Sequence, residues 1–416
     1  MNTLVDIENV RTLAGKHEKI PVRPLTILTG ENSSGKTAFM ACLSVLSDPI
    51  GFPLNPNFDL PPYSLGRYDT IASHRSGDSG PAKSFSLGWA DTNSGFRVLA
   101  TYENRGGAAV LKSFDSHSKY ADINLLADRS AQKYEVTVSL ARTAKTYQFS
   151  LVSSNLPLDD LITHSLVRLY PGEIDLESSY LGYQTLGAPN SLAPIRAKPD
   201  RTYDPGSEAF SPEGGHIPSL LEKLLGDANS AEQSNDIRHD LEQFGSESGL
   251  FRHMEVKSLG KKGSDPFQVL VNVGGRAVNL LDVGYGVSQA LPVIVEGRFS
   301  PARTLLIQQP ELHLHPKAQA ALGTFFSRLA SSILKGQAKR EFVIETHSDY
   351  IVDRIRREVA QKTISRESVI ILYFERNGLS TIVHPLELDD AGNILNAPPS
   401  YREFFVREEL DLLTRV

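Results

Sequence analysis

Eight consecutive residues, Gly30 to Thr37, have the types and spacing that bind nucleoside phosphates. They form the loop Gly-Glu-Asn-Ser-Ser-Gly-Lys-Thr. Glycine lets backbone N–H groups close around phosphate oxygens, Lys36 reaches the β- and γ-phosphates, and Thr37 offers a hydroxyl to Mg²⁺. We therefore predict that the chain binds ATP together with Mg²⁺. The predicted phosphate-binding residues of this loop are Gly30, Asn32, Ser33, Ser34, Gly35, Lys36 and Thr37.

The flanking segments place this loop between a strand and a helix. The apolar run Pro24–Thr29 precedes it, and a helix-like stretch, Ala38–Leu46, follows it. Strand, loop and helix in this order form the setting in which the motif binds phosphate. The only cysteine, Cys42, falls in the predicted helix. We expect it to be a small buried apolar residue, with no disulfide or thiolate metal site.

A second apolar run, Thr304–Ile307, is a predicted buried strand that ends in Gln308 and Gln309. In P-loop NTPases such a strand end carries an acid that holds Mg²⁺, and often a second acid that orients the attacking water. Glutamine supplies neither an anionic Mg²⁺ ligand nor a carboxylate base. We therefore expect slow hydrolysis, with Gln308 beside Thr37 at the metal. Glu311 is the nearby acid that could compensate, although we expect it beyond the strand end.

A third apolar run, Phe342–Ile344, is followed shortly by His347. After a phosphate loop and the preceding strand, a histidine at this place is predicted to sense the γ-phosphate. His313 and His315 alternate with leucines and could suggest a metal pair, but a structural turn of hydrogen-bonding imidazoles is the favoured interpretation. The predicted catalytic residues are Gln308, Gln309, Glu311 and His347.

The segment Leu281–Pro292 is glycine-rich and then becomes helix-like. Small residues and a serine at a helix start can hold a phosphate through N–H groups and a hydroxyl. Alone, this pattern would indicate a plain helix start. Its place shortly before the strand that ends in Gln308 favours a phosphate contact, with Gly286, Ser288 and Gln289 as the binding residues.

Composition bounds the protein class. The 416 residues exceed the size of one ordinary core, so two or three lobes are expected. Hydrophobic residues at 40% and charged residues at 22% are typical of a globular protein, and no apolar run approaches a membrane span. The start shows no secretory signal, so we expect a cytoplasmic location and no membrane partner. A net charge of −6 argues against a generally basic nucleic-acid binder.

Changes of pattern along the chain predict its domain organisation. Alternating runs such as Phe96–Tyr102 and Tyr134–Leu140 indicate antiparallel strands, whereas residues 185–218 are rich in proline and glycine. Helical patterns follow at residues 217–225 and 231–244. The predicted segments are 1–83, the N-terminal part of the ATPase core; 84–185, an antiparallel β lobe; 186–265, a Pro/Gly-rich connection and helical region; 266–350, the C-terminal part of the core; and 351–416, a C-terminal extension.

Together these blocks resemble the ABC-type ATPase heads of the SMC and overcoming-lysogenisation-defect group, and within it the prokaryotic AAA15-like predicted ATPases. The tail is similar to that of members ending in a short conserved region of unknown function. The resemblance implies an α/β fold: an ABC/SMC-type P-loop NTPase head with an inserted antiparallel β lobe and a small helical region. The matching blocks are Gly30–Thr37, Asp282–Gln289 as the signature, Gln308–Pro316 and Thr346–Ser348.

The resemblance also implies that two heads bind face to face and head to tail, with ATP between the P-loop of one and the signature of the other. Gly286 and Ser288 would then touch the γ-phosphate in trans, so that ATP joins the heads and hydrolysis releases them. Relatives usually have Asp-Glu or Glu-Gln where this chain has Gln308 and Gln309. The sequence does not distinguish natural loss from an engineered substitution that traps the ATP state. We expect Gln308→Glu to raise the hydrolysis rate.

Two functional classes follow. In the favoured one, the chain is the ATPase and sensor or scaffold subunit of a bacterial anti-phage defence system, holding or releasing a separate effector such as a nuclease or toxin. The tail after Thr346 is too short for a Toprim nuclease. The alternative is an SMC-like DNA-clamping ATPase in repair or maintenance, which the acidic balance and missing coiled coil disfavour. A transporter subunit is weaker still, since the signature differs from the LSGGQ form.

Three further features keep two interpretations each. The segment Phe58–Asp69 could take the place of the ABC glutamine loop or be a surface loop. Arg196 and Arg201 could contact phosphate or a partner head, or be solvated. The cluster Arg354–Arg357 lies on a predicted helix, where a solvated face is favoured over a nucleic-acid contact.

Overall fold

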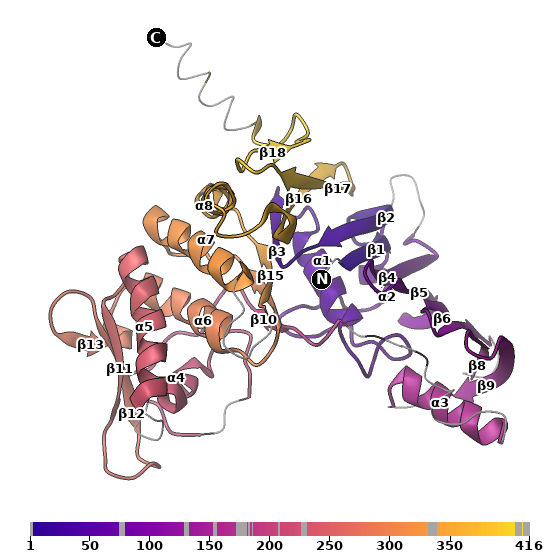
Figure 1. Cartoon of the computed structure of the whole chain (residues 1–416), viewed down its shortest axis with the longest axis horizontal. Coiled ribbons are helices and arrows are strands. Elements are labelled where there is room, and N and C mark those ends of the chain that lie inside the picture. The colour runs from indigo at the N-terminus through magenta and orange to yellow at the C-terminus, as the bar shows by residue number, and fades with distance from the viewer. Residues whose placement is uncertain are drawn as a thin grey trace.

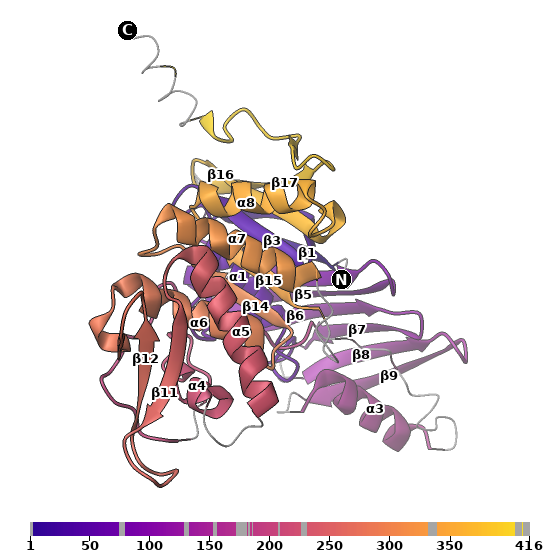
Figure 2. The ribbon, with the colours of Figure 1, turned by 60° about the vertical axis from the view of Figure 1, so that its left-hand side comes forward.

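The computed structural model shows a central parallel sheet with helices on one side and a large antiparallel sheet on the other (Figures 1 and 2). No helix in the described part of the chain is long and apolar enough to cross a membrane. For residues 231–236 the backbone alone is described. The structure describes residues 3–74, 80–128, 133–152, 156–171, 181, 184, 186–206, 209–225, 231–331, 339–403 and 410.

The central sheet has seven strands in the order β10-β14-β15-β3-β16-β17-β18. The first five are parallel, and β17 and β18 are antiparallel additions. The middle strands are near-continuous apolar runs, because parallel strands are buried on both faces. The strands are β10 (Asn190–Leu192), β14 (Thr304–Gln308), β15 (Glu341–Glu345), β3 (Leu25–Gly30), β16 (Val369–Asn377), β17 (Ser380–Leu388) and β18 (Ile394–Leu395).

Side chains of the central strands alternate between two cores. Leu28 and Val343 pack in the core that includes α1, whereas Ile27 and Ile344 pack in the core that includes α6, α7 and α8. Every second residue of a strand faces the same side. The last residue of β15 therefore points to the α1 side, where the phosphate loop ends. These helices are α1 (Lys36–Leu46), α6 (Tyr285–Phe299), α7 (Pro316–Ser331) and α8 (Asp349–Ala360).

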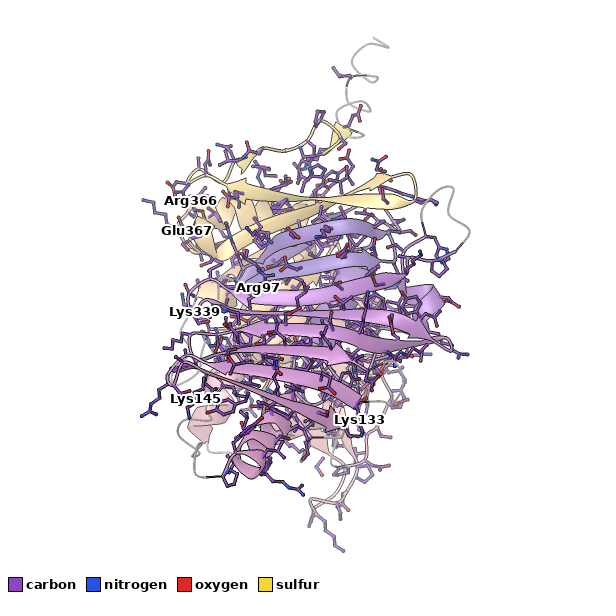
Figure 3. All side chains as sticks on the ribbon, turned by 90° about the vertical axis from the view of Figure 1, so that its right-hand side faces the viewer. Arg97, Lys133, Lys145, Lys339, Arg366 and Glu367 are labelled. Carbon is purple, nitrogen blue, oxygen red and sulfur yellow. The ribbon has the colours of Figure 1, made fainter. Side chains whose placement is uncertain are left out.

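The antiparallel sheet has eight strands in the order β2-β1-β4-β5-β6-β7-β8-β9, and Figure 3 shows it from the side on which Arg97, Lys133 and Lys145 are labelled. Buried and exposed residues alternate along β8 and β9, as expected for strands with one covered face. The short helix α2 (Tyr68–Ile71) precedes β4, and α3 (Leu158–Leu169) contacts β9. The strands are β1 (Thr3–Val10), β2 (Leu13–Val22), β4 (Ser84–Asp91), β5 (Phe96–Arg105), β6 (Ala108–His117), β7 (Ala121–Ala127), β8 (Lys133–Leu140) and β9 (Lys145–Val152).

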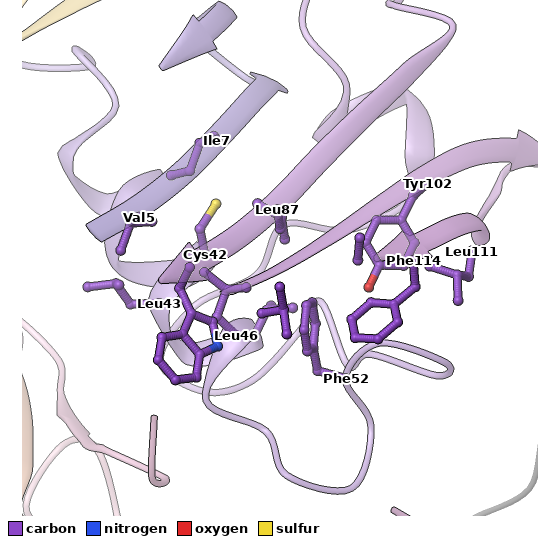
Figure 4. Packing of buried hydrophobic residues seen from close by; sticks show 14 of the residues in the cluster. Val5, Ile7, Cys42, Leu43, Leu46, Phe52, Leu87, Tyr102, Leu111 and Phe114 are labelled. Carbon is purple, nitrogen blue, oxygen red and sulfur yellow. The ribbon is translucent and has the colours of Figure 1, made fainter. Parts of the chain in front are cut away.

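Helix α1 packs against this antiparallel sheet (Figure 4). Cys42 lies on α1 near Ile7 of β1 and Leu87 of β4 and has no exposed surface. Burial raises the pKa of its thiol to about 12. The expectation of a small buried apolar residue at this position is confirmed.

A smaller unit lies on the far side of α6 and α7. It contains α4 (Ile217–Leu225), α5 (Ala231–Ser248) and a three-stranded antiparallel sheet that ends in the 3₁₀ turn η1 (Leu280–Asp282). The two predicted helices are present, and β11 is a strand that the sequence patterns did not indicate. The strands are β11 (His253–Ser258), β12 (Phe267–Asn272) and β13 (Ala277–Asn279).

The predicted α/β fold, with the phosphate loop between a central strand and a helix and with an antiparallel β lobe, is confirmed. Two predicted segment boundaries divide continuous sheets. The strands β4 to β9 extend the sheet begun by β1 and β2, so residue 84 is not a sheet boundary. Likewise β16, which follows the 3₁₀ turn η2 (Arg366–Ser368), pairs directly with β3, so this strand of the predicted C-terminal extension belongs to the central sheet. Local patterns identify strands, but they do not show which strands pair.

Candidate functional site

The predicted phosphate loop connects β3 to α1 with the backbone geometry that its glycines require. Gly30 has φ 134°, and a Cβ there would lie 2.3 Å from the backbone oxygen of Phe374. Gly35 has φ 94°, and its Cβ would lie 2.6 Å from the Thr12 hydroxyl. Side chains at either position would clash and strain the backbone. The loop is thus enclosed by β16 on one side and by the β1–β2 turn on the other.

Lys36 lies over this loop. Its ammonium donates hydrogen bonds to the backbone oxygens of Gly30, at 3.1 Å, and Glu31, at 2.7 Å. Burial lowers the pKa of Lys36, while the charge of Glu345 opposes this shift most among the neighbouring acids. The lysine is thus positioned within the loop that would surround the β- and γ-phosphates.

The structure adds an acid to the site that the sequence analysis did not assign. The Thr37 hydroxyl lies 2.9 Å and 3.2 Å from the two carboxylate oxygens of Glu345, the last residue of β15. The side-chain amide of Gln308 donates to the same carboxylate at 3.4 Å. Gln308 and Glu345 are register partners on neighbouring parallel strands, and both are buried.

A signal for Glu345 was present in the sequence. It follows three apolar residues, Phe342–Ile344, at the end of β15 and directly precedes a Thr-His-Ser turn, which is the kind of strand end where P-loop enzymes place acids. The missing information was the strand order. β15 lies between β14 and β3, so its end adjoins the strand that leads into the phosphate loop.

The oxygen atoms at this edge fit Mg²⁺. Mg²⁺ prefers oxygen ligands, and the Thr37 hydroxyl, the Glu345 carboxylate and the Gln308 amide present such atoms beside the loop. Mg²⁺ bound there would neutralise charge on the nucleotide phosphates. The protein side chains would hold and orient the nucleotide. No group of three or more His, Cys, Asp or Glu side chains gathers around a potential metal position within the described residues.

Glu311 links the ends of β14 and β15. One of its oxygens accepts from the backbone N–H of His347 at 2.7 Å, and the other accepts from the Thr346 hydroxyl at 2.8 Å. Burial raises the pKa of Glu311, and these hydrogen bonds act in the opposite direction. Glu311 lies past the strand end, as expected, and both of its oxygens are engaged in holding the His347 turn.

The remaining predicted catalytic residues follow the strand ends. His347 is exposed by its residue surface. The pKa of its imidazole is lowered mainly by partial desolvation of the ring, and further by the positive charge of Lys36. Gln309 has φ 42° and donates its backbone N–H to the Glu345 carbonyl at 2.7 Å. It is less buried than Gln308. A carboxylate at position 308 would adjoin Glu345, and like charges disfavour joint ionisation. The rise in ATP hydrolysis rate expected for Gln308→Glu stays a prediction, and we expect a smaller rise than the sequence alone suggests.

The predicted signature opens α6. Gly286 lets this helix approach the next loop, since a Cβ there would lie 3.1 Å from the backbone oxygen of His313. Ser288 is buried and donates its hydroxyl hydrogen to the Tyr285 carbonyl at 3.0 Å. Gln289 is also buried, and its side-chain oxygen accepts a long hydrogen bond, 3.4 Å, from the backbone N–H of Arg196. Gly286 is the most accessible of the three residues predicted to bind phosphate.

The signature and the P-loop occupy separate places in one chain. Tyr285 at the start of α6 lies near His313, which follows β14; the two rings are tilted, with 5.8 Å between their centroids. β14 and β3 are separated by β15, so they are about 10 Å apart at the usual strand spacing. The structure thus brings Gln308, Glu311 and His347 to the phosphate loop, but no hydrogen bond between described residues joins Ser288 to that loop.

Arg196 and Arg201, each of which had two interpretations, lie in different environments. Arg196 is 4% exposed and donates from Nη2 to the Gln308 carbonyl at 3.0 Å. Burial lowers its pKa to about 10, opposed by the charge of Glu311, and its Nε and Nη1 have no hydrogen-bond partner among the described residues. Arg201 forms a bidentate ion pair with Asp282 at the surface, at 2.7 and 2.9 Å. Arg196 is therefore a buried residue of the site.

Three other regions named from the sequence can be placed. The segment Phe58–Asp69 buries Tyr63, whose pKa is raised by burial and also by the charge of Glu345, so this loop approaches the site. His315 accepts through Nδ1 from the Lys317 backbone N–H at 3.3 Å. The arginine cluster lies on α8, where Arg354 donates to the Thr324 hydroxyl at 3.0 Å.

The C-terminal part of the chain also reaches the site. A cavity of about 520 Å³ opens beside the P-loop. Tyr401 packs edge-on against Tyr373 of β16, and Arg402 forms ion pairs with Asp349 and Asp353 of α8. Residues beyond the predicted core therefore form one wall of a space next to the phosphate loop. The cavity is lined by Thr29, Gly30, Glu31, His347, Asp349, Tyr373, Ser400, Tyr401, Arg402 and Glu403.

Known proteins provide matches at the level of family and structure. Residues 25–353 match the AAA_21 family, described as "AAA domain, putative AbiEii toxin, Type IV TA system". A search among curated proteins finds no match. The chain is similar to a solved SMC head bound to the C-winged helix domain of ScpA, with 12% identity, a TM-score of 0.47, and coverage of 93% of this chain and 98% of that one.

Two further SMC heads give similar values. The SMC head domain from Thermotoga maritima has 10% identity and a TM-score of 0.41, covering 93% of this chain and 100% of that one. The Smc head domain with an extended coiled coil bound to the C-terminal domain of ScpA, from Pyrococcus furiosus, has 10% identity and a TM-score of 0.43, covering 98% of each chain.

Proposed function

Because the chain belongs to the AAA_21 family of AAA domains, which its match over residues 25–353 shows, we propose that it is an ATPase subunit whose two copies close head to tail around ATP. Each ATP–Mg²⁺ would lie on the P-loop of one copy and meet the signature of the other. ATP binding would then favour the closed dimer, and hydrolysis would reopen it.

The observation that carries this proposal is the separation of the two half-sites. Lys36 and Thr37 hold one half, and the start of α6 holds the other beyond the end of β14. A second copy turned head to tail would bring its own Gly286 opposite the first P-loop. The site would be complete only in that dimer.

Exposed apolar side chains support a contact face at the same edge of the sheet. Ile195 follows β10, Tyr285 starts α6 beside the loop after β14, and Tyr350 follows β15. Their exposed fractions are 78%, 58% and 54%. The carboxyl ends of parallel strands share one edge, so these side chains lie along the edge that carries the phosphate loop.

The output that we propose is control of a separate effector. A switch between open and closed dimers can hold or release a partner such as a nuclease or toxin, and slow hydrolysis at Gln308 and Gln309 would prolong the closed state. The description of the family names a toxin and a type IV toxin–antitoxin system. We therefore assign the chain to bacterial anti-phage defence, as an AAA15-like, OLD-related sensor or scaffold in the cytoplasm.

The solution mass with and without ATP–Mg²⁺ tests the dimer. The wild-type chain should shift from monomer to dimer on adding nucleotide, and Lys36→Ala should not. Gly284→Glu should also stay monomeric, since it places a negative charge at the signature. An added Cβ at Gly284 meets no atom within 4 Å, so the fold tolerates a side chain there, and Gly284→Ala is the matched control. A wild-type monomer at saturating ATP would contradict the proposal.

Mixing the two inactive variants tests the head-to-tail arrangement. A dimer of one Lys36→Ala copy and one Gly284→Glu copy contains one intact composite site, because the intact P-loop faces the intact signature. Partial dimer formation in the mixture, absent from each variant alone, is expected. Stoichiometric co-purification of an effector from the native host then supports the sensor role, whereas salt-sensitive retention of DNA would favour a DNA-clamping ATPase.

A further inference from the structure

Glu345 is a buried carboxylate whose hydrogen-bond partners are neutral groups. It is 5% exposed, and it accepts from the Thr37 hydroxyl at 2.9 Å and from the Gln308 amide at 3.4 Å. Within the described part of the chain no Lys, Arg or His side chain forms an ion pair with it; the ammonium of Lys36 is engaged with backbone oxygens. A buried charge is costly unless it is paired or coordinates a metal.

The spacing to Thr37 matches that of two ligands on one Mg²⁺. Mg²⁺ has octahedral coordination with bonds of about 2.0–2.1 Å, so neighbouring ligand oxygens are about 2.9 Å apart. The Thr37 hydroxyl lies 2.9 Å from one oxygen of Glu345. Thr37 is the P-loop residue whose hydroxyl faces Mg²⁺. The carboxylate is therefore in place to share that ion, directly or through one water.

Neighbouring groups orient this carboxylate toward the phosphate loop. Gln308 donates its amide to Glu345 from the paired position of β14, a contact of the kind that orients metal ligands. The negative charge of Glu345 also acts on Lys36 and on the buried Tyr63. The P-loop helix α1 and strand β14 thus both contact this acid, and the loop between α1 and α2 carries a tyrosine within its electrostatic influence.

We propose that Glu345 supplies the carboxylate that faces the nucleotide-bound Mg²⁺, from the strand adjacent to the one that ends in Gln308. Gln308 then serves as a positioning residue for Glu345. The proposal rests on nucleotide binding by the P-loop, which is part of the proposed function, but it does not need the dimer.

A structural role for Glu345 makes a different prediction. Glutamine at this position would still accept a hydrogen bond from Thr37 through its amide oxygen. Glu345→Gln would then be silent if the contact only holds Thr37. The double variant Glu345→Gln with Gln308→Glu exchanges the two side chains across one register pair, so it keeps one carboxylate and one amide at the site.

The experiment measures ATP affinity by calorimetry in EDTA and in saturating Mg²⁺, with the full-length chain. The ratio of the two affinities is the gain from Mg²⁺. For Glu345→Gln we expect an unchanged affinity in EDTA and a gain reduced by about tenfold or more, while the exchange variant recovers the gain to within about threefold. Glu135→Gln, at an exposed position of β8, is the matched control and should keep the full gain.

Each outcome decides the proposal. A full Mg²⁺ gain in Glu345→Gln overturns it. If Glu345→Gln loses ATP binding in EDTA as well, the exchange variant decides: a gain near that of wild type supports the proposal, and no gain overturns it. All of these affinities are measured in the Gly284→Glu background, which stays monomeric, so they report the P-loop of a single chain. A failure of the ATP-dependent dimer would show in the solution mass and leave this result intact.

Discussion

The neighbouring strands β14 and β15 end side by side, but in side chains of opposite character. β14 ends in the amide Gln308 and is followed by Gln309, whereas β15 ends in the carboxylate of Glu345 and is followed by the turn at His347. The two strands are in register, with Gln308 opposite Glu345. The edge beside the P-loop therefore contains an acid, on the strand next to the one where sequence patterns place it.

This contrast indicates that a carboxylate can lie beside the P-loop although it belongs to the strand next to the one where the motif places it. A carboxylate at the end of either strand reaches the Thr37 hydroxyl side of the P-loop, because the register pair places both side chains on the α1 face. A chain with two glutamines at the expected strand end can thus retain an anionic partner for Mg²⁺. The missing function on β14 is the base that would activate water.

The largest expected effect comes from removing the acid of β15. Glu345→Gln should lower the ATP hydrolysis rate by about a hundredfold, since the Mg²⁺-facing carboxylate is lost. Gln308→Ala should lower it by less than about tenfold, because only a positioning contact is removed. Steady-state phosphate release measures both. If Glu345→Gln and Gln308→Ala lost the same fraction of the hydrolysis rate, the two strand ends would not have different roles.

A second expected effect comes from cutting the link between the strand ends. Glu311→Ala removes the acceptor of the Thr346 hydroxyl and of the His347 N–H. Thr346 is fully buried, and an unpaired buried donor costs about 1–3 kcal/mol. We expect lower thermal stability and a slower hydrolysis rate. Glu311→Gln retains one acceptor oxygen and should lose less. Thermal unfolding that is unchanged in Glu311→Ala would show that this link is not structural.

A gain is expected from restoring an acid to the end of β14. Gln309→Glu adds a carboxylate that can act as a general base, at a less buried site than Gln308. We expect the hydrolysis rate to rise by about tenfold, within the range of general-base catalysis. Gln309→Ala is the control and should show no gain. A rate that does not rise in Gln309→Glu would mean that chemistry is not the slow step.

The smallest effect on turnover is expected from an acid away from both strand ends. Glu296 of α6 is buried with His216 at 2.8 Å. Burial alone would raise its pKa, but hydrogen bonds from His216, Asn190 and Ser300 outweigh this and hold the pKa below the usual value. Glu296→Gln should leave hydrolysis within about twofold, because distant sites act independently.

The same variant has a pH signature. A carboxyl whose pKa is lower in the folded state stabilises the protein above its unfolded pKa, about 4.5, and loses this contribution as the pH falls through the folded value. Wild type should therefore exceed Glu296→Gln in stability at neutral pH, and the difference should shrink below about pH 4.5. Urea unfolding across this pH range measures it; a constant difference would contradict the assignment.

Sequence patterns identified the parts of the site that are local. The P-loop, the strand before Gln308 and the turn at His347 each depend on residues close in the chain, so spacing and apolar runs reveal them. The antiparallel lobe follows from alternating runs in the same way, whereas the α/β head was expected from the family resemblance of these blocks. Each of these parts of the site is a short buried strand followed by a polar turn, which neighbouring residues alone can indicate.

The parts that could not be predicted depend on contacts across the chain. Thr37 and Glu345 are far apart in sequence and meet only because β15 lies between β14 and β3. Arg196 has a surface-like proline-rich neighbourhood in the sequence, but the fold buries its guanidinium against the Gln308 carbonyl. Strand order decides both contacts, and no local pattern encodes it.

The most direct test of the relocated acid is an experimental structure of the wild-type chain with Mg²⁺ and a non-hydrolysable ATP analogue. We predict that a carboxylate oxygen of Glu345 binds the ion, or a water of its shell, next to the Thr37 hydroxyl. An ion held by Thr37, phosphates and water alone, with the Glu345 carboxylate turned away from its shell, would contradict the account.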